Sequence, residues 1–199
     1  MLRRNFSSLL SAAIVVLACL PLAANGDEPA SADAQAEMMD KWMKFAEPGP
    51  PHEQFKRLVG KWTTVSEEYQ SNPDNPPKSE GTAEFELIMG GRYLKTNYAA
   101  SFSGMPMEGM GIQGYDNQQK KYVGMWIDNF GTGILTSTGT YEVASNTLTE
   151  LAKGSGPMGP IKMKMVTKYE SKDKFTLSIY TIKDDGSSKL DMVITHTRK

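Results

Sequence analysis

Residues Ala83-Glu84-Phe85-Glu86-Leu87 alternate apolar and acidic side chains. A period of two places one set of side chains in a core and the other in water, which is typical of a β-strand with one buried face. The same alternation recurs at residues 161–165 and 175–179, and a period of two continues from Gly60 to the end of the chain. The pattern predicts ten strands, at residues 62–69, 81–89, 92–102, 107–115, 121–128, 133–141, 147–153, 161–170, 175–183 and 189–198.

The connections between these strands carry turn-forming residues, such as Gly90-Gly91, Asp116-Asn117 and Asp184-Asp185-Gly186. Short strands joined by tight turns, with no helical pattern between them, indicate an antiparallel meander, which has two exposed edges unless it closes on itself. We therefore predict an all-β protein with a single antiparallel up-and-down, lipocalin-like β-barrel of about ten strands. The alternative is a β-sandwich, which needs Greek-key crossovers, and only residues 70–78 and 154–160 form long connections.

Two helices are predicted before the barrel. Ser31 is a suitable N-cap for the first, and the proline-rich stretch 48–51 ends it. A second, short helix is predicted from Pro51, because Phe55 and Leu58 recur at helical spacing and proline is favoured at a helix start. The apolar side chains of the first helix recur at helical spacing and lie at Met38, Met39, Trp42 and Met43.

The N-terminal residues 1–26 have the pattern of an export signal. Arg3 and Arg4 precede a nearly apolar run at residues 9–20, and small residues at 22–26 suit cleavage near 24–26. Cys19 follows Ala18 and is compatible with a lipobox, in which case cleavage precedes Cys19 and the protein is lipid-anchored. We expect an exported, periplasmic or extracellular protein with a signal peptide at 1–26, a helix and linker at 27–50 and a barrel domain at 51–199.

Composition excludes several classes of protein. The chain has 199 residues, 39% of them hydrophobic, with 22 basic and 23 acidic side chains and one cysteine. The apolar content is too high for a disordered chain, and the balanced charge argues against nucleic acid as a partner. A single thiol cannot form an internal disulfide. After residue 26 no apolar run approaches the roughly 20 residues that a transmembrane helix needs.

Three separated residues resemble the signature of calycin barrels, the superfamily of the lipocalins. Gly60-Lys61-Trp62 resembles the Gly-x-Trp opening of the first strand, and Arg198 stands where the last strand returns beside it. The resemblance implies that Gly60, Trp62 and Arg198 are structural residues, with the arginine lying across the tryptophan in a cation–π contact.

A closer resemblance covers residues 48–198. The chain is similar to the bacterial family called domain of unknown function 1579 (DUF1579), which implies a barrel and assigns no substrate, cofactor or catalytic residue. The matching motifs are Pro50-Pro51-His52-Glu53, Leu58-Val59-Gly60-Lys61-Trp62, Ile88-Met89-Gly90-Gly91-Arg92-Tyr93-Leu94, Gly114-Tyr115-Asp116, Trp126-Ile127-Asp128 and Gly131-Thr132-Gly133.

The leading functional hypothesis is a binding barrel that holds a small apolar ligand, and no catalytic residue is assigned. Its alternative is a barrel filled by its own side chains, which would suit a structural or interaction module of the cell envelope. The residues expected to line the interior are Phe85, Leu87, Tyr98, Phe102, Met110, Ile112, Trp126, Met163, Met165, Leu177 and His196.

Two cofactor alternatives accompany this hypothesis. Met105, Met107 and Met110 place three thioethers close together in sequence, and thioethers are ligands for Cu(I); the alternative is flexible packing at the barrel mouth. His196 alternates in step with Leu190, Met192 and Ile194, so its side chain is expected to point into the barrel near the rim. Nitrobindin-like barrels bind haem through a histidine late in the chain. The alternative for His196 is a hydrogen-bonded residue at the barrel rim.

An enzyme is the remaining class, and we expect it less than a binding protein. Asp116 and Asp128 end strands of neighbouring hairpins, and with His196 and Arg92 they would form an acid–base site if they converged. The simpler interpretation of both aspartates is a role in turns. The glycines of the middle strands are interpreted as sites of barrel curvature.

Overall fold

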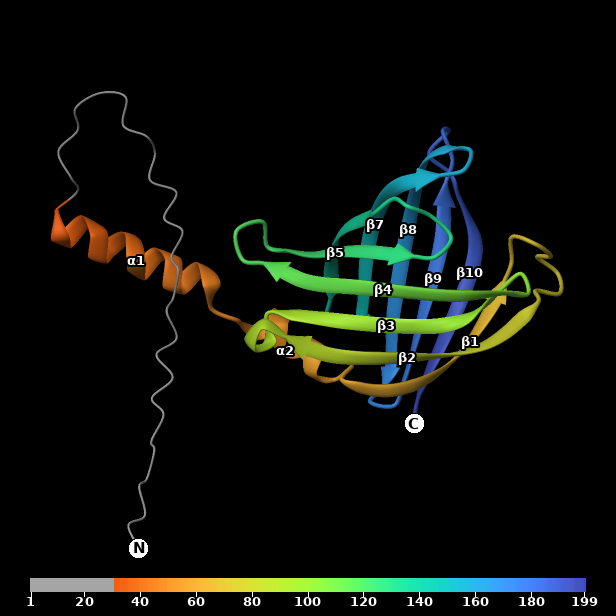
Figure 1. The fold of residues 1–199 in the computed structure, drawn as a ribbon, viewed down its shortest axis with the longest axis horizontal. Coiled ribbons are helices and arrows are strands. Elements are labelled where there is room, and N and C mark those ends of the chain that lie inside the picture. The colour runs from red at the N-terminus through yellow and green to blue at the C-terminus, as the bar shows by residue number, and fades with distance from the viewer. Residues whose placement is uncertain (1–30) are drawn as a thin grey trace, which may run out of the picture. The chain divides into compact units, whose positions relative to one another are not determined.

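A computed structural model describes residues 31–199 (Figure 1). The expected export signal and Cys19 lie outside the described residues. The described residues divide into two units, with the boundary between Asp40 and Lys41. Helix α1 (Ala32–Ala46) begins after Ser31 as predicted, and none of its residues is buried. Within residues 31–199, no helix has both the length and the apolar character needed to cross a membrane.

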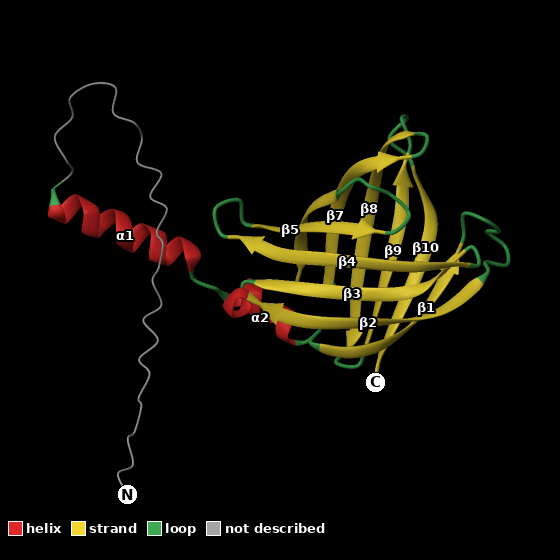
Figure 2. Ribbon diagram, in the orientation of Figure 1, coloured by secondary structure: helices red, strands yellow, loops and turns green. Residues whose placement is uncertain are grey.

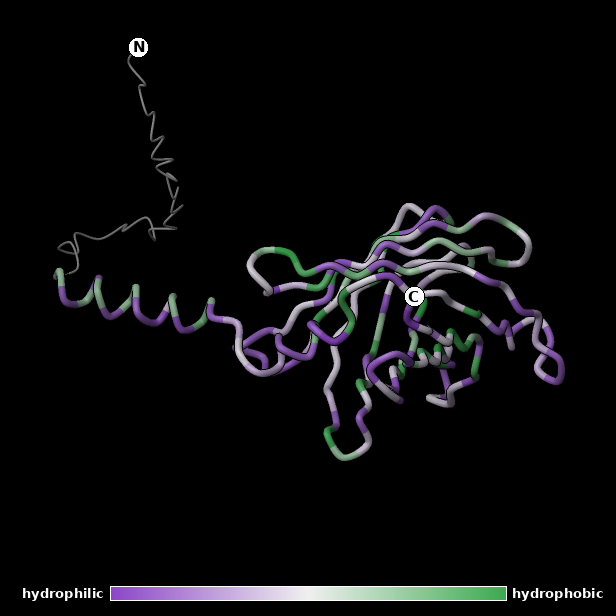
Figure 3. Tube along the Cα trace, turned by 90° about the horizontal axis from the view of Figure 1, so that it is seen from below, coloured by the Kyte–Doolittle hydropathy of each residue, from purple (hydrophilic) through white to green (hydrophobic). Residues whose placement is uncertain are grey.

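Ten antiparallel strands close into a barrel, which confirms the predicted fold and excludes the sandwich (Figure 2). Each strand pairs with its neighbours in chain order, and β1 pairs with β10 to close the sheet. Hydrophobic and hydrophilic positions are interleaved along the strands (Figure 3). The strands are β1 (Gly60–Glu68), β2 (Lys78–Ile88), β3 (Tyr93–Phe102), β4 (Met105–Asp116), β5 (Lys121–Asp128), β6 (Leu135–Glu142), β7 (Thr147–Gly156), β8 (Gly159–Ser171), β9 (Lys174–Ile182) and β10 (Ser188–Arg198).

Most strand boundaries lie within three residues of their predicted positions. The β4 and β8 strands begin earlier than predicted and include Pro106 and Pro160, each the second residue of its strand. Proline has no N–H group to donate to the neighbouring strand, but it is tolerated near the start of a strand. The alternation pattern therefore underestimates the length of these two strands.

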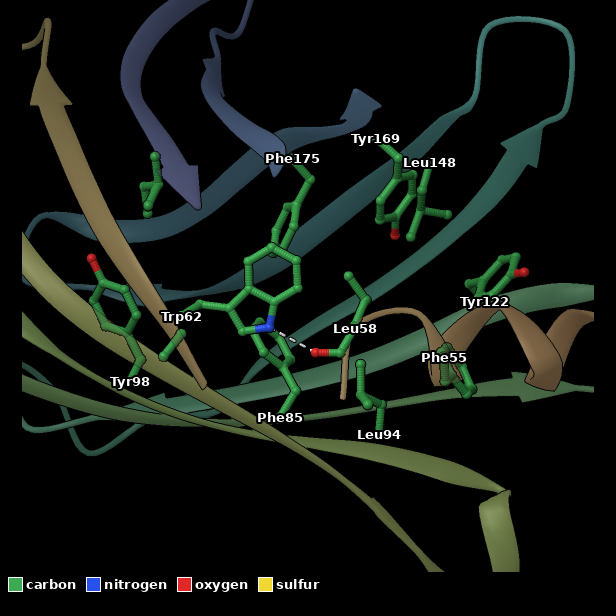
Figure 4. Close-up of a cluster of buried hydrophobic side chains, with 12 residues drawn as sticks. Phe55, Leu58, Trp62, Phe85, Leu94, Tyr98, Tyr122, Leu148, Tyr169 and Phe175 are labelled. Carbon is green, nitrogen blue, oxygen red and sulfur yellow. Dashed lines mark hydrogen bonds between the residues drawn. The ribbon is translucent and has the colours of Figure 1, made fainter. Parts of the chain in front are cut away.

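The short helix α2 (Pro50–Lys56) and the residues after it close one end of the barrel. Phe55 and Leu58 are buried; the Phe55 ring packs edge-on to Tyr122 at 5.9 Å between centroids, and Trp62 Nε1 donates a hydrogen bond of 2.8 Å to the Leu58 carbonyl (Figure 4). His52 fixes the start of α2, because its Nδ1 accepts a hydrogen bond of 3.0 Å from the Gly49 amide. We call this the closed end, and the opposite end, where β1 finishes at Glu68, the open end.

The cation–π contact that the resemblance to calycin barrels implies is present. The Arg198 guanidinium carbon lies 4.2 Å from the centre of the Trp62 ring. Its nitrogens donate hydrogen bonds to the carbonyls of Arg57, Val59 and Lys172, so one side chain joins α2, β1 and the β8–β9 turn.

Candidate functional site

Buried residues establish which side chains face the barrel interior. On β1, Trp62, Thr64, Ser66 and Glu68 are buried, while the residues between them are more exposed. Residues paired across two neighbouring strands direct their side chains to the same face of the sheet. The inward positions of β1 therefore identify the inward positions of every other strand through the register.

The inward side chains differ between the two ends of the barrel. At the closed end Phe85, Leu148 and Phe175 are at most 8% exposed. Toward the open end, the inward apolar side chains are only partly buried, and they include Met107, Trp126, Leu177, Ile179 and Met192. These side chains point away from the outer surface and pack against the core cluster. We call this inner region of the open half the lumen.

Trp126 lies against the wall of the lumen rather than across it. A Cβ atom at Gly109 would overlap the indole ring, and one at Gly111 would lie 3.2 Å from its Cε3 atom. The indole Nε1 donates a hydrogen bond of 2.7 Å to Oδ2 of Asp128, which fixes the ring in this position. The two glycines of β4 therefore provide the space in which the tryptophan of β5 lies flat.

Glu150 follows the wall in the same way. Its side chain leaves β7, passes over Gly139 of β6, where a Cβ atom would overlap its Cγ, and brings Oε1 to 3.7 Å from a Cβ placed at Gly124 of β5. Ser137 Oγ donates to Oε1 at 2.9 Å, and Gln113 Nε2 of β4 donates to Oε2 at 3.1 Å. The carboxyl group thus spans three neighbouring strands on the inner face.

Burial dominates the electrostatics of Glu150. The residue is 5% exposed, and this desolvation raises the pKa of its carboxyl above the ordinary 4.5, although the hydrogen bonds from Ser137 and Gln113 act in the opposite direction. Both donors are neutral, so they satisfy lone pairs without supplying a counter-charge.

Further polar groups face inward along the barrel. Glu68, also 5% exposed, accepts hydrogen bonds of 3.1 Å from the amide and the hydroxyl of Ser103. Ser66 and Tyr98 are joined through their hydroxyls at 3.0 Å. Thr64 Oγ1 is buried and has no hydrogen-bond partner among the described residues. The interior is therefore a mixed surface rather than a purely apolar one.

The structure places most of the expected lining residues on the inner face. Phe85, Leu87, Tyr98, Trp126 and Leu177 belong to the core cluster or pack against it. Met163 and Met165 pair with Ala152 and Glu150 of β7, which places them on the inner side of β8. Phe102 lies at the open end, with its ring 5.6 Å from that of Phe130.

The prediction for Met110 and Ile112 is wrong. Met107, Gln113 and Tyr115 face inward on β4, and alternation therefore directs Met110 and Ile112 outward. The sequence Gly-Met-Gly-Ile at 109–112 suggests buried apolar residues, yet the glycines hold the inner positions because Trp126 covers them.

The same alternation separates the three methionines considered as Cu(I) ligands. Met107 packs against the core, Met105 is 53% exposed at the start of β4, and Met110 faces outward. Residues three apart on a strand lie on opposite faces, so the thioethers of Met107 and Met110 do not converge on one ion. Among residues 31–199, no group of three or more His, Cys, Asp or Glu side chains has the arrangement of a metal site.

His196 faces inward but lies at the closed end, within the aromatic cluster. Its ring stacks on Phe175 at 4.0 Å between centroids and 13° between planes, and it is 4% exposed. Burial lowers its pKa to about 4. A haem ligand needs space above a ring nitrogen for the porphyrin, and the packing of Phe85 and Phe175 around His196 does not fit that group.

The acid–base set does not assemble. Asp116 and Asp128 end two consecutive antiparallel strands and therefore lie at opposite ends of the barrel, separated by the eight residues of β5, roughly 25 Å. Asp116 accepts hydrogen bonds from the amides of Gln118 and Gln119 in its turn, as the simpler interpretation predicts. Arg92 donates to the carbonyls of Ala46 and Met89, away from Asp128.

Two hollows lie on the outer wall of the described region. One, of about 470 Å³, is bordered by the outward side chains of Lys61, Glu84 and Glu108 over β1–β4. The other, of about 410 Å³, lies beside it at Met110 and Ile127. Both lie on the outside of the sheet, away from the inward-facing side chains, so we consider the lumen as the candidate binding site.

Sequence reasoning missed the polar residues of the inner wall, above all Glu150, Gln113 and Ser137. A signal was present at residues 148–152, where Leu148, Glu150 and Ala152 share one parity and Leu151 stands on the other. A charged side chain between two buried apolar positions of one parity indicates an inward carboxyl group.

Comparisons with known proteins agree with the fold. A family model described as "Protein of unknown function (DUF1579)" matches residues 47–198. The crystal structure of Rv2717c from M. tuberculosis superposes with a TM-score of 0.54 at 14% identity, covering 77% of this chain and 99% of that one. A redesigned beta barrel, mFAP1, bound to DFHBI has a TM-score of 0.39 at 18% identity, covering 72% and 97%. No curated protein matches the sequence.

Proposed function

The chain belongs to the DUF1579 family, and from its barrel we propose that it binds a small, largely apolar molecule in the lumen, entering through the open end. The family description assigns no activity, so the proposal rests on the inner wall. A binding role needs a concave, mostly apolar surface with a few placed polar groups, and the open half of the barrel has this composition.

The observation that carries the proposal is the position of the two large side chains on the inner wall of β4–β7. Trp126 lies over Gly109 and Gly111, and Glu150 lies over Gly139 and Gly124. A barrel filled by its own residues would direct large side chains toward the axis. Glycines paired with flat-lying side chains instead keep bulk away from the centre.

Solvent access supports the same conclusion. Met163 and Met165 are inward-facing and yet only half-buried, whereas Tyr169 farther along the same strand is 8% exposed. A ligand in the lumen would cover the part of these apolar side chains that the protein leaves exposed. Burying such surface favours binding by about 25 cal/mol per Å².

A carrier of this kind fits an exported protein. The export pattern at residues 1–26 supports a location outside the cytoplasm, where small apolar molecules need a protein to keep them dissolved. We propose that export and ligand carriage belong together in this protein.

Native mass spectrometry of the chain purified from its own host tests the proposal. We expect a reproducible added mass with a stoichiometry of one. Met163→Trp places a large ring in the lumen near the open end and should reduce the added mass, whereas Lys162→Trp, on the outer face of the same strand, should leave it unchanged. A bare mass in the unmodified chain, or equal added mass in all three proteins, would contradict a lumen site.

A further inference from the structure

Glu150 is an acidic side chain at the centre of the inner wall, and no cationic side chain of the described residues is paired with it. Its carboxyl group accepts hydrogen bonds from Ser137 and Gln113, both neutral, and forms no ion pair within the described part of the chain. A carboxylate offers about four lone-pair positions, so two remain for another donor.

The ionisable side chains on the inner face of strands β1 to β9 that could carry charge near pH 7 are all acidic. Besides Glu150, Glu68 and Asp128 occupy inward positions nearer the open end. By the strand register, the strand lysines from Lys61 to Lys174 share the outward parity; Lys164, for example, lies 4.5 Å from the ring of Tyr180 on the outer face. Lys189, an exposed residue near the start of β10, pairs with the inward-parity Thr181 at the open end. In the described part of the chain, the inner wall around Glu150 thus carries acidic groups and no lysine or arginine, and Lys189 lies at the open rim.

The nearest cation at the closed end is already engaged. Arg57 lies 3.5 Å from the ring centre of Tyr169 and donates to Asn146 Oδ1 at 3.0 Å. Tyr169 and Tyr122 also face this region, and burial raises the pKa of each to about 12, so both are neutral near pH 7. None of these groups neutralises Glu150.

A buried carboxylate without a cation is costly, and removing its water leaves an attraction for a positive partner that is stronger than in solvent. Resting on the proposed function, we infer that the lumen selects amphipathic molecules that carry a protonated amine, with the ammonium group against Glu150 and the apolar part against Trp126 and Met165. Thr64 provides a second polar contact inside the barrel, since its buried hydroxyl has no partner among the described residues.

The rest of the wall suits such a ligand. Trp126 presents a ring face to the lumen, and aromatic faces attract cations as well as apolar groups. Met165 pairs directly with Glu150 across the β7–β8 ladder, which places a flexible apolar side chain beside the carboxyl group. These contacts suit a ligand with a short apolar body attached to one cationic head group.

Three linear probes with eight carbon atoms each test the inference. Octylammonium, 1-octanol and octanoate are titrated into the full chain at pH 7, with Trp fluorescence and calorimetry as readouts. We expect octylammonium to bind at least about tenfold more tightly than 1-octanol, because a hydrogen bond to a charged, desolvated group is stronger than one between neutral groups. Octanoate should bind most weakly, because its charge repels Glu150.

Glu150→Gln keeps the shape of the side chain and removes its charge. The variant should lose the preference for octylammonium while its affinity for 1-octanol stays within about twofold. Glu80→Gln, an exposed position on the outer face of β2, is the matched control and should behave as the unmodified chain.

The outcomes separate the two proposals. Binding of none of the three probes would overturn the lumen site and this inference with it. Binding of all three with similar affinity in the unmodified chain, or an amine preference that persists in Glu150→Gln, would overturn the role of Glu150 and leave the apolar lumen standing. The comparison of probes in the unmodified chain needs no variant, so the test holds even if Glu150→Gln folds poorly.

Discussion

Gly109 and Trp126 share one site on the inner wall: the indole of Trp126 occupies the space that a side chain at residue 109 would need. This relationship links the fold to the proposed function, because a tryptophan that lies flat against β4 takes up less of the barrel interior than one directed across it. Glu150 repeats the arrangement over Gly139 and Gly124.

Replacing Gly109 by alanine should therefore destabilise the barrel. We expect Gly109→Ala to lower the free energy of unfolding by about 1–3 kcal/mol, the usual range for overpacking, and to shift the emission of Trp126. Gly111→Ala should cost less, because its Cβ would lie 3.2 Å from the ring. Urea denaturation measures both, with Gly131→Ala, in an open turn, as the control. Equal stability of Gly109→Ala and Gly131→Ala would contradict the packing described.

Glu150→Gln should change the pH dependence of stability. The folded pKa of Glu150 is raised, so its contribution to stability is fully present below the unfolded pKa of about 4.5 and is lost as the pH rises through the folded pKa. The variant should accordingly gain stability over the unmodified chain at pH 8 and show little difference at pH 4. Thermal unfolding across this range gives the difference, and a gain that is the same at every pH would show that Glu150 is not the titrating group.

His196 should make the fold sensitive to mild acid. Its folded pKa is about 4 and its unfolded value 6.5, so stability is present above pH 6.5 and is lost as the pH falls toward 4. The loss amounts to about 3 kcal/mol over that window. In His196→Phe, which retains an aromatic ring beside Phe175, the unfolding free energy should decline less between pH 7 and pH 4. Parallel pH profiles for the two proteins would refute this assignment.

Even a conservative substitution of Arg198 should destabilise the barrel. Lysine retains the charge but cannot keep a planar group over Trp62 while donating to the carbonyls of Val59 and Lys172. We expect Arg198→Lys to lose about 1–3 kcal/mol of stability in chemical denaturation. Lys199→Ala, at the neighbouring exposed position, should stay within about 0.5 kcal/mol of the unmodified chain. A loss of similar size in both variants would contradict a specific role for Arg198.

The fold was predictable because it follows from local patterns. Alternation placed the ten strands, turn residues separated them, and Gly60, Trp62 and Arg198 identified how the barrel closes. These features depend on neighbours in sequence or on one recognisable motif.

The inner wall was less predictable because it depends on pairs of residues from different strands. Met110 and Ile112 are apolar residues two apart, which predicts that they face inward. Trp126 on the next strand occupies the inner space instead, so the inward positions of β4 are the glycines 109 and 111. Asp116 and Asp128 are close in sequence, and antiparallel order separates them. Glu150 carried its own signal in the parity of residues 148–152, but its partners Gln113 and Ser137 become visible only through the register.

The most direct test of a ligand-binding lumen is NMR of the chain with ¹³C-labelled methionine methyl groups, titrated with 1-octanol. Met163 and Met165 line the lumen, whereas Met89 and Met158 are 71% and 97% exposed on the outside. A ligand in the lumen should cause saturable shifts of the Met163 and Met165 methyl signals while those of Met89 and Met158 stay in place. Unchanged signals for Met163 and Met165 at saturating octanol, or shifts shared equally by all four methionines, would contradict a ligand-binding lumen.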